Sequence, residues 1–478
     1  MRFKQIHLLI FSTFFLFITI NLQAQENWSL ERCINYAIDN NLVIKQQGLS
    51  VQLAEADLLQ SKATILPDIN GNASHAYNFG QTIDRFTNTF ATERVQSNNF
   101  YLSSNIAVFN GFVLLNTIRQ NKLNLLSSRY NLEKMQDDVS LQIATAYLNI
   151  LYNIEVLEVA ETTVAVTRQQ VDRTEKMVKA GTLAKGNLLT IEAQKATEEL
   201  QVVNAKNQLD LSYLTLTQML DLPTTEGFEI EKPDVAIPDE ITLLNHPESI
   251  YSYAVSNLPE IKSAEISVES SMRGLAIARG YSSPSLILSG SYGTGYSEAA
   301  QQLKDFALTG DTNTIGVTLD GNNTLVGVPA TKYNYERIPF KDQINDNLNK
   351  SIGLYMSVPI FNGLQTRTSI NRAKIAVKNA EYNLQISKNE LYKTIQQAHA
   401  DAVAALNEYH AAGKSVEALE ESFNYTEQKF NVGLVNTVEY NDAKSKLTAS
   451  RSDLLRTKYN FIFRKTILDF YMGKPIKL

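Results

Sequence analysis

The chain has 478 residues, of which 44% are hydrophobic and 20% are charged, so it is long enough for one large core or two domains. Its formal charge of −6 gives no basic surface of the kind that binds nucleic acid. The single cysteine, Cys33, excludes an internal disulfide and a cysteine-based metal site.

The first residues are typical of an export signal. Arg2 and Lys4 supply positive charge, an apolar run follows over residues 8–20, and the small residue Ala24 suits a cleavage site. We therefore predict a signal peptide at 1–24. The alternative, a retained membrane anchor, is disfavoured because the apolar run is short for a membrane span.

A lipid on Cys33 is also disfavoured, because the bulky Arg32 precedes it where a small residue is needed. Beyond the leader, no stretch reaches the ~20 apolar residues of a membrane helix. If the exported protein enters a membrane, we therefore expect it to do so by strands.

The chain contains an internal repeat. At an offset of 252 residues, Phe109-Asn110-Gly111 coincides with Phe361-Asn362-Gly363, and the match continues to Pro223 and Pro475. Upstream, Pro67 matches Pro284 at an offset of 217, which leaves a 35-residue insertion in the second copy. We therefore predict repeat 1 at 25–220, a Pro-rich linker or equatorial segment at 221–247 beside the middle of the helices, and repeat 2 at 248–478.

Each repeat is expected to run helix, two strands, long helix, turn, helix. From Phe112 to Lys179 there is no Pro or Gly, and apolar residues recur about every 3.6 residues, which predicts one helix of 68 residues. Such a helix is roughly 100 Å long. Two shorter helices stacked end to end can run antiparallel to it, at 29–64 and 187–220. The corresponding helices of repeat 2 are expected at 247–281, 364–431 and 438–471.

The strands are predicted from alternation, in hairpins at about 68–109 and about 285–361. In the last strand Ile352, Leu354 and Met356 share one face, and the polar or small residues between them share the other. A soluble sheet alternates in the same way. The lengths of about 10–12 residues and the aromatic residues at the strand ends favour a membrane barrel.

Four strands per chain are too few for a membrane barrel, which needs at least eight, and open edges in lipid are forbidden. Three chains would supply twelve strands, whereas two would leave a barrel narrow enough for side chains to fill. We therefore expect a trimer. The 35-residue insertion is expected to be an extracellular loop.

The duplicated layout, the paired FNG junctions and two helix-turn motifs, KAGTLAKGNLLTIEA (179–193) and FNVGLVNTVEYNDA (430–443), resemble the TolC-like outer-membrane efflux protein family. This family is the outer-membrane factor of tripartite efflux or type I secretion systems, and the resemblance covers essentially the whole mature chain. It implies a mainly α protein with a membrane β-barrel, in which a homotrimer forms a 12-stranded barrel in outer-membrane lipid and continues as a long periplasmic α-helical barrel.

The same resemblance implies a channel of the cell outer membrane that extends into the periplasm. It would be a passive exit duct for small toxic compounds or secreted substrates. An inner-membrane transporter would drive export through a periplasmic adaptor (membrane fusion) protein. No cofactor is implied.

An acidic pair is expected at one helix turn. Glu439 and Asp442 are spaced i, i+3 and so share a helix face, whereas repeat 1 has Asn187 and Thr190 in the same register. The resemblance implies that these carboxylates face the lumen at the constricted tip and form a ring of six in a trimer, the lumen acidic gate. The alternative is that an acidic first turn simply favours the helix dipole, and both roles can coexist.

The turn departs from the family pattern. In well-known members a Tyr and an Arg flanking the glycine bond a carboxylate of the first copy and hold the tip closed. Here those three positions are Phe430, Val435 and Asn187, which cannot form that ion pair. Lys185 reaching Glu439 is one conceivable substitute.

The helix turns are also the expected contact with the adaptor, although the glycines would end the helices in any case. The residues are Gly181, Thr182, Leu183, Gly433, Leu434 and Val435.

At the barrel–tunnel junction, each residue type of the repeated motif has a separate expected role. Phe109 and Phe361 would lie at the inner membrane interface, Asn110 and Asn362 would cap the long helices, and Gly111 and Gly363 would let the backbone turn.

The sequence offers no catalytic constellation, no metal-ligand spacing among its histidines and no phosphate-binding loop. We therefore do not expect an enzyme. The competing interpretation is a non-channel periplasmic coiled-coil scaffold or adaptor protein, which explains the helices but gives the paired strands no role.

Overall fold

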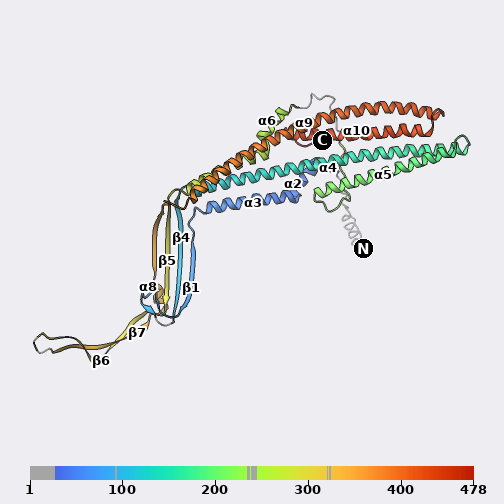
Figure 1. Ribbon diagram of the computed structural model, residues 1–478. Helices are drawn as coiled ribbons and strands as arrows, with labels where there is room; N and C mark the ends of the chain where they lie inside the picture. Colours follow the sequence, from blue (N-terminus) through green and yellow to red (C-terminus); the bar gives the residue numbers. More distant parts are fainter. Residues whose placement is uncertain are drawn as a thin grey trace, which may run out of the picture. The chain divides into compact units, whose positions relative to one another are not determined.

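The computed structural model describes residues 27–91, 94–233, 237, 245–319, 321 and 324–477. The predicted signal peptide at 1–24 lies outside the described residues. The chain divides into two units (Figure 1). Unit 1 comprises the residues up to Glu55, Leu123–Glu269 and Lys378 onward, and unit 2 comprises Ala56–Lys122 and Ser270–Val377.

The helices recur at the two sequence offsets. Two helices of 67 residues each, roughly 100 Å long, are followed by helices of 35 residues. The bounds of these four helices are α4 (Val113–Lys179), α5 (Lys185–Met219), α9 (Gln365–Asn431) and α10 (Thr437–Tyr471). The shorter helices are α2 (Leu30–Asn40), α3 (Leu42–Ala63), α6 (Pro247–Asn257) and α7 (Pro259–Gly280). Among the described residues, no helix is long and apolar enough to cross a membrane.

The prediction of single helices at 29–64 and 247–281 was wrong, because each is broken at one residue. Asn41 has an extended backbone between α2 and α3. Its side-chain oxygen accepts from the backbone amide of Val43 at 2.9 Å, and its side-chain nitrogen donates to the backbone carbonyl of Met219 at 3.1 Å. At the matching position Leu258 is extended, and Pro259 begins α7. The Asn41 side chain and the fixed backbone angle of Pro259 account for the two breaks.

Unit 1 has a core that includes part of the predicted linker. The hydroxyl of Tyr147 donates to the carbonyls of Trp28 at 3.0 Å and Glu231 at 2.8 Å, and Trp28 forms a parallel bridge with Ile230. Cys33 is fully buried in this core, and burial raises the pKa of its thiol to about 12. The linker therefore packs against the helices through Phe228, Ile230 and Ile237, and residues 234–236 and 238–244 lie outside the described residues.

Unit 2 contains an antiparallel four-stranded sheet in the order β1-β4-β5-β8. Its strands are β1 (Asn70–Asn78), β4 (Val95–Asn110), β5 (Ser285–Ser297) and β8 (Asn349–Ser357). A small hairpin, β2 (Thr82–Ile83) and β3 (Phe90–Ala91), connects β1 to β4. Within this sheet β1 and β8 each have a strand partner on one side, so both outer edges are open.

The last strand ends four residues earlier than predicted. The hairpin was expected to reach Phe361, but β8 ends at Ser357, which pairs with Ser285, the first residue of β5. Pro359 has no amide hydrogen for a ladder, and β5 offers no residue beyond Ser285 to pair with.

The insertion of repeat 2 is not an irregular loop. It forms a second, longer hairpin of β6 (Gln301–Val317) and β7 (Leu325–Arg337), followed by α8 (Phe340–Asp346). We call β6 and β7 together the arm. Figure 1 shows the arm leaving the sheet beside α8, at the end away from the long helices' first turns.

Candidate functional site

Each long helix ends in the same left-handed glycine turn. Gly181 and Gly433 have φ of +75° and +80°. In the first turn the amide of Gly181 donates to the carbonyl of Val178 at 3.0 Å, and Thr182 donates to Met177 at 3.0 Å. The second turn makes the corresponding bonds at 3.1 and 2.9 Å. This pattern is a Schellman motif, which ends a helix and satisfies its last carbonyls.

The acidic pair lies in the first two turns of α10. Asn436 caps this helix, since its side-chain oxygen accepts from the amides of Val438 and Glu439. Its amide group donates in turn to the Glu439 carboxylate at 3.1 Å. Asp442 pairs with Lys446 at 2.7 Å, and both side chains are exposed. Glu439 thus lies in the first turn of α10, where a carboxylate favours the helix dipole, and both carboxylates are exposed to solvent.

The predicted bond of Lys185 to Glu439 is not formed, although the structure describes both residues. Other contacts join the two turns. The guanidinium of Arg173 on α4 donates to the side chain of Asn431 at the end of α9, and to its carbonyl at 3.4 Å. The hydroxyl of Thr437 lies 3.5 Å from the side-chain oxygen of Asn187, so the two helix hairpins meet at their tips.

Phe430 has a packing partner instead of a polar one. Its ring stacks on Tyr440 at a centroid distance of 4.7 Å, and Phe423 lies against the same ring at 5.4 Å. Tyr440 is buried, and burial raises the pKa of its hydroxyl to about 12. These rings join α9 to α10 just inside the turn. Leu434 is 76% exposed, and Leu183 is half-buried.

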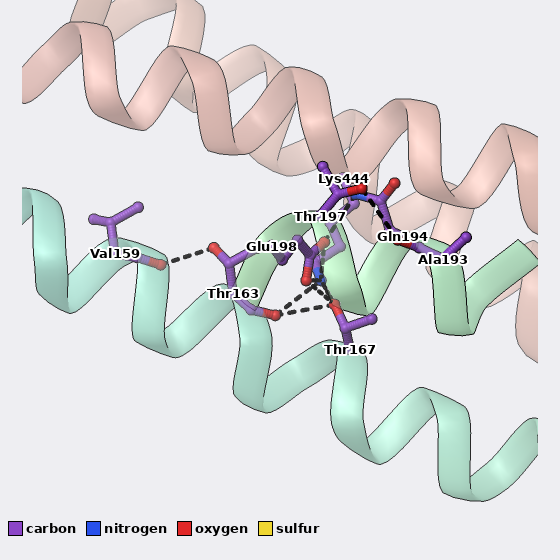
Figure 2. A network of polar contacts seen from close by, with 8 residues as sticks. All are labelled: Val159, Thr163, Thr167, Ala193, Gln194, Thr197, Glu198 and Lys444. Atoms are coloured by element: carbon purple, nitrogen blue, oxygen red, sulfur yellow. Dashed lines mark hydrogen bonds and ion pairs between the residues drawn. The ribbon is translucent and has the colours of Figure 1, made fainter. Parts of the chain in front are cut away.

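A buried ion pair lies about one helical turn beyond Tyr440 along α10 (Figure 2). The Lys444 ammonium on α10 lies 3.1 and 3.2 Å from the two carboxylate oxygens of Glu198 on α5, and these side chains are 8% and 3% exposed. Lys444 also donates to the carbonyl of Thr163 at 2.9 Å and to the hydroxyl of Thr167, both on α4.

The same network satisfies the carboxylate fully. Glu198 accepts from Thr167 and, at 3.0 Å, from the side-chain amide of Gln194. Burial lowers the pKa of Lys444, and the Glu198 charge opposes that shift. The pair therefore ties α10 of repeat 2 to both helices of the repeat 1 hairpin, across three elements.

We did not predict this pair from the sequence. A signal was available, because the two residues are points at which the repeats differ: Glu198 corresponds to Ser450, and Lys444 corresponds to Glu192. In repeat 2, Ser450 donates to Ser415 at 3.1 Å, so a neutral hydrogen bond occupies the position of the buried charge.

At the junction of strand and long helix, the backbone is left-handed at two consecutive residues in each repeat. Gly111 and Phe112 have φ of +64° and +60°, and Gly363 and Leu364 have +61° and +65°. A Cβ on Gly111 would clash with the carbonyl oxygen of Gly280, whereas one on Gly363 would have no neighbour within 4 Å. The first junction is thus tightly packed and the second is open.

Asn110 and Asn362 precede the two long helices, and their side chains accept hydrogen bonds from backbone amides of the first helical turn. Phe112 occupies the N-cap position of α4, since its carbonyl accepts from Asn116 at 3.0 Å. The Asn110 side chain accepts from the amide of Leu114 at 3.4 Å, and Asn362 accepts from Thr366 at 3.5 Å. Phe109 packs edge-on against Phe112 at 5.5 Å, and Phe361 is 79% exposed within one chain.

Within the described part of the chain, no group of three His, Cys, Asp or Glu residues could hold a metal ion. Near the turns, Asn436 caps α10, Asp442 pairs with Lys446 within the same helix, and hydrogen bonds join the two hairpins. The arrangement is therefore suited to setting and joining helix ends.

The chain matches the outer membrane efflux protein family over residues 33–221 and 250–474. Outer membrane protein TolC of Escherichia coli (strain K12) is 22% identical over 441 residues, covering 91% of this chain and 80% of TolC. Outer membrane efflux protein BepC of Brucella suis biovar 1 is 19% identical, covering 92% of this chain and 84% of BepC. The crystal structure of the outer membrane protein VceC from Vibrio cholerae superposes with a TM-score of 0.73 at 14% identity, covering 94% of this chain and 96% of VceC.

The four-stranded sheet and the duplicated long helices thus have the fold of the outer membrane protein VceC. The chain belongs to the outer membrane efflux protein family, which confirms the resemblance seen in the sequence. It is a protein of the outer membrane that extends into the periplasm, and its family consists of efflux proteins rather than enzymes.

Proposed function

We propose that the protein is a trimeric outer-membrane channel that acts as a passive exit duct. The observation that carries this proposal is the antiparallel four-stranded sheet with both outer edges open, in a chain whose long helices have 67 residues. Open edges cannot remain in lipid, so the strands have to be completed by further copies of the chain.

Three copies give twelve strands, enough to enclose an aqueous passage, whereas eight strands leave an interior that side chains fill. Helices of roughly 100 Å are far longer than a bilayer is thick, so in this proposal they form a tube that crosses the periplasm. Membrane fractionation together with heat-dissociable trimers on gels tests the assembly. A soluble, monomeric mature chain would contradict it and would favour the coiled-coil scaffold.

We further propose that the chain works with a periplasmic adaptor and an inner-membrane transporter, which supply the energy for export. The adaptor would contact the two glycine turns, including Leu183 and Leu434. This docking site is supported by the apolar side chains at the helix ends, of which Leu434 is 76% exposed.

The carboxylates of Glu439 and Asp442 are proposed to form a six-membered acidic ring at the tip of the trimer. This proposal is supported by the exposure of both carboxylates, which among the described residues pair with the cap residue Asn436 and with Lys446 of the same helix. Such a ring would attract cations and hold a multivalent one.

The prediction is that Glu439→Ala with Asp442→Ala lowers cation selectivity and weakens block by multivalent cations. Single channels in a planar bilayer would measure both properties. As a control, Asn436→Asp retains a capping side chain and leaves both carboxylates in place, so its selectivity should not fall. Unchanged selectivity in the double variant would contradict the acidic ring.

A further inference from the structure

The arm leaves one apolar face uncovered. In its half nearest the sheet, the cross-strand pairs Leu303–Tyr335, Phe306–Tyr333 and Leu308–Thr331 alternate with polar pairs on the other side. Phe306 is 64% exposed and Tyr333 is 55% exposed. We call the five residues Leu303, Phe306, Leu308, Tyr333 and Tyr335 the apolar face.

The opposite face is polar and internally bonded. The side-chain amide of Asn334 donates to Asp305 at 2.6 Å, and Gln302 donates to Glu336 at 3.1 Å. Lys332 projects from this face beside them, opposite Ala307. The two faces therefore differ in chemistry as the two faces of a half-buried sheet do.

The base of the arm is held firmly. The Gln343 side chain is 2% exposed. Its oxygen accepts from the backbone amide of Ser297 at 2.9 Å. Its nitrogen donates to the backbone carbonyls of Ser297 at 3.0 Å and Ile338 at 2.8 Å. Arg337 pairs with Glu298 at 2.7 Å. Gln343 thus joins Ser297, the last residue of β5, to Ile338, the residue after the arm, so the arm emerges from a fixed point.

A two-stranded hairpin is only marginally stable alone in water, and an apolar face of this kind on a soluble surface marks an interaction site. The strands of the arm carry three cations, Lys304, Lys332 and Arg337, and three anions, Asp305, Asp311 and Glu336. The charges of the two strands cancel, Asp320 between them in the sequence adds one anion, and no charged side chain belongs to the apolar face.

The position of the arm indicates what covers this face. The chain passes from the arm through α8 directly into β8, the edge strand that a second copy has to pair with in the proposed trimer. The arm therefore leaves the sheet beside the expected boundary between copies, and a threefold axis would place three identical apolar faces around one line.

We propose that the arms of three copies pack together through their apolar faces around the threefold axis, beyond the outer end of the barrel. The inference rests on the proposed trimeric channel. It adds a contact between copies that is separate from the pairing of strand edges.

Cysteine cross-linking tests the contact in the full-length protein. The only native thiol, Cys33, is fully buried, so the wild-type chain provides a background without cross-links. Two matched pairs of variants are Tyr333→Cys with Asn334→Cys, and Phe306→Cys with Ala307→Cys. The first of each pair belongs to the apolar face, and its neighbour belongs to the opposite face.

Purified trimers at low concentration would be treated with a copper oxidant and separated on denaturing, non-reducing gels. Tyr333→Cys and Phe306→Cys should yield several-fold more covalently linked chains than their controls. Equal or absent cross-linking in intact trimers would overturn the arm contact and leave the channel in place, with a lipid or another protein as the cover. A wild-type chain that forms no trimers would overturn both proposals.

Discussion

At the scale of single residues, burying the Lys444–Glu198 pair costs desolvation free energy, and both charged groups have hydrogen-bond partners in return. Taking two charges out of water is expensive, and here the compensation comes from their mutual attraction and from Thr163, Thr167 and Gln194. Such a pair adds little net stability over apolar residues, but the loss of one partner leaves a buried charge unpaired.

We therefore predict that Lys444→Met destabilises the helical unit by about 3 kcal/mol. Lys444→Met combined with Glu198→Leu should recover most of that loss, because no charge is then left buried. Chemical unfolding followed by circular dichroism in detergent would measure both. The matched control is Lys446→Met, which breaks the exposed pair with Asp442 and should have little effect. A double variant no more stable than Lys444→Met would contradict the argument.

The two junction glycines make a second comparison possible. Gly111 and Gly363 have nearly the same φ, so an alanine at either incurs the same left-handed strain, about 1 kcal/mol. At Gly111 the added Cβ also meets the backbone oxygen of Gly280, which has to move.

Gly111→Ala should therefore cost about 1–3 kcal/mol more than Gly363→Ala. The temperature at which trimers dissociate, compared between the two variants, would measure the difference. Equal temperatures would mean that the close approach to Gly280 can relax without cost.

At the scale of elements, the long helices were predicted correctly, whereas the breaks in the two shorter helical segments were missed. An uninterrupted apolar period without Pro or Gly fixes α4 to within one residue at each end, and the glycine turns follow from the same sequence. Pro259 is a local signal for one of these breaks, whereas the Asn41 side chain is also held by a bond to Met219, 178 residues away, which no local pattern reveals. The same holds for Lys444 and Glu198, whose positions meet only after three helices have packed.

The arm was missed for a different reason. Its sequence is rich in Gly, Thr, Asn and Asp, which predicts turns and loops. The strand pairing absorbs these residues through three register shifts, between Leu303 and Asp305, between Leu308 and Thr312, and between Thr314 and Gly316. Bulges of this kind interrupt the simple alternation on which strand prediction relies.

The helix turns carry a prediction of their own. If Leu434 contacts the adaptor, Leu434→Asp places a charge in an apolar contact and should abolish most export while trimers persist. Leu434→Met keeps the apolar surface and should retain export. Survival of a deletion strain carrying each variant, on a panel of toxic compounds, would measure the effect. Full export with Leu434→Asp would exclude docking at this residue, and the half-buried Leu183 would be tested next in the same way.

At the scale of the whole molecule, the two repeats are not equivalent. They share helix bounds to the residue, yet repeat 2 alone carries the arm, and the tip acids and the buried lysine lie on its last helix. The shared parts build the wall of the proposed duct. Of the unshared parts, the arm and the tip acids lie where contacts with other copies or a cation site are proposed, whereas the buried lysine joins the two repeats of one chain.

This division predicts that the arm can be removed without loss of the duct. Repeat 1 connects β1 to β4 without an arm, and β6 and β7 pair only with each other. A variant in which an Asn-Gly turn replaces residues 303–335 should keep the Gln343 anchor, reach the outer membrane as trimers and export the same compounds. Its trimers should dissociate at a lower temperature, because the apolar contact between arms is gone.

Heat-dissociation gels would measure the stability of the trimers, and growth on the panel of toxic compounds would measure export. Loss of trimers at ambient temperature would show that the arm is needed for assembly itself, and an unchanged dissociation temperature would contradict packing between arms.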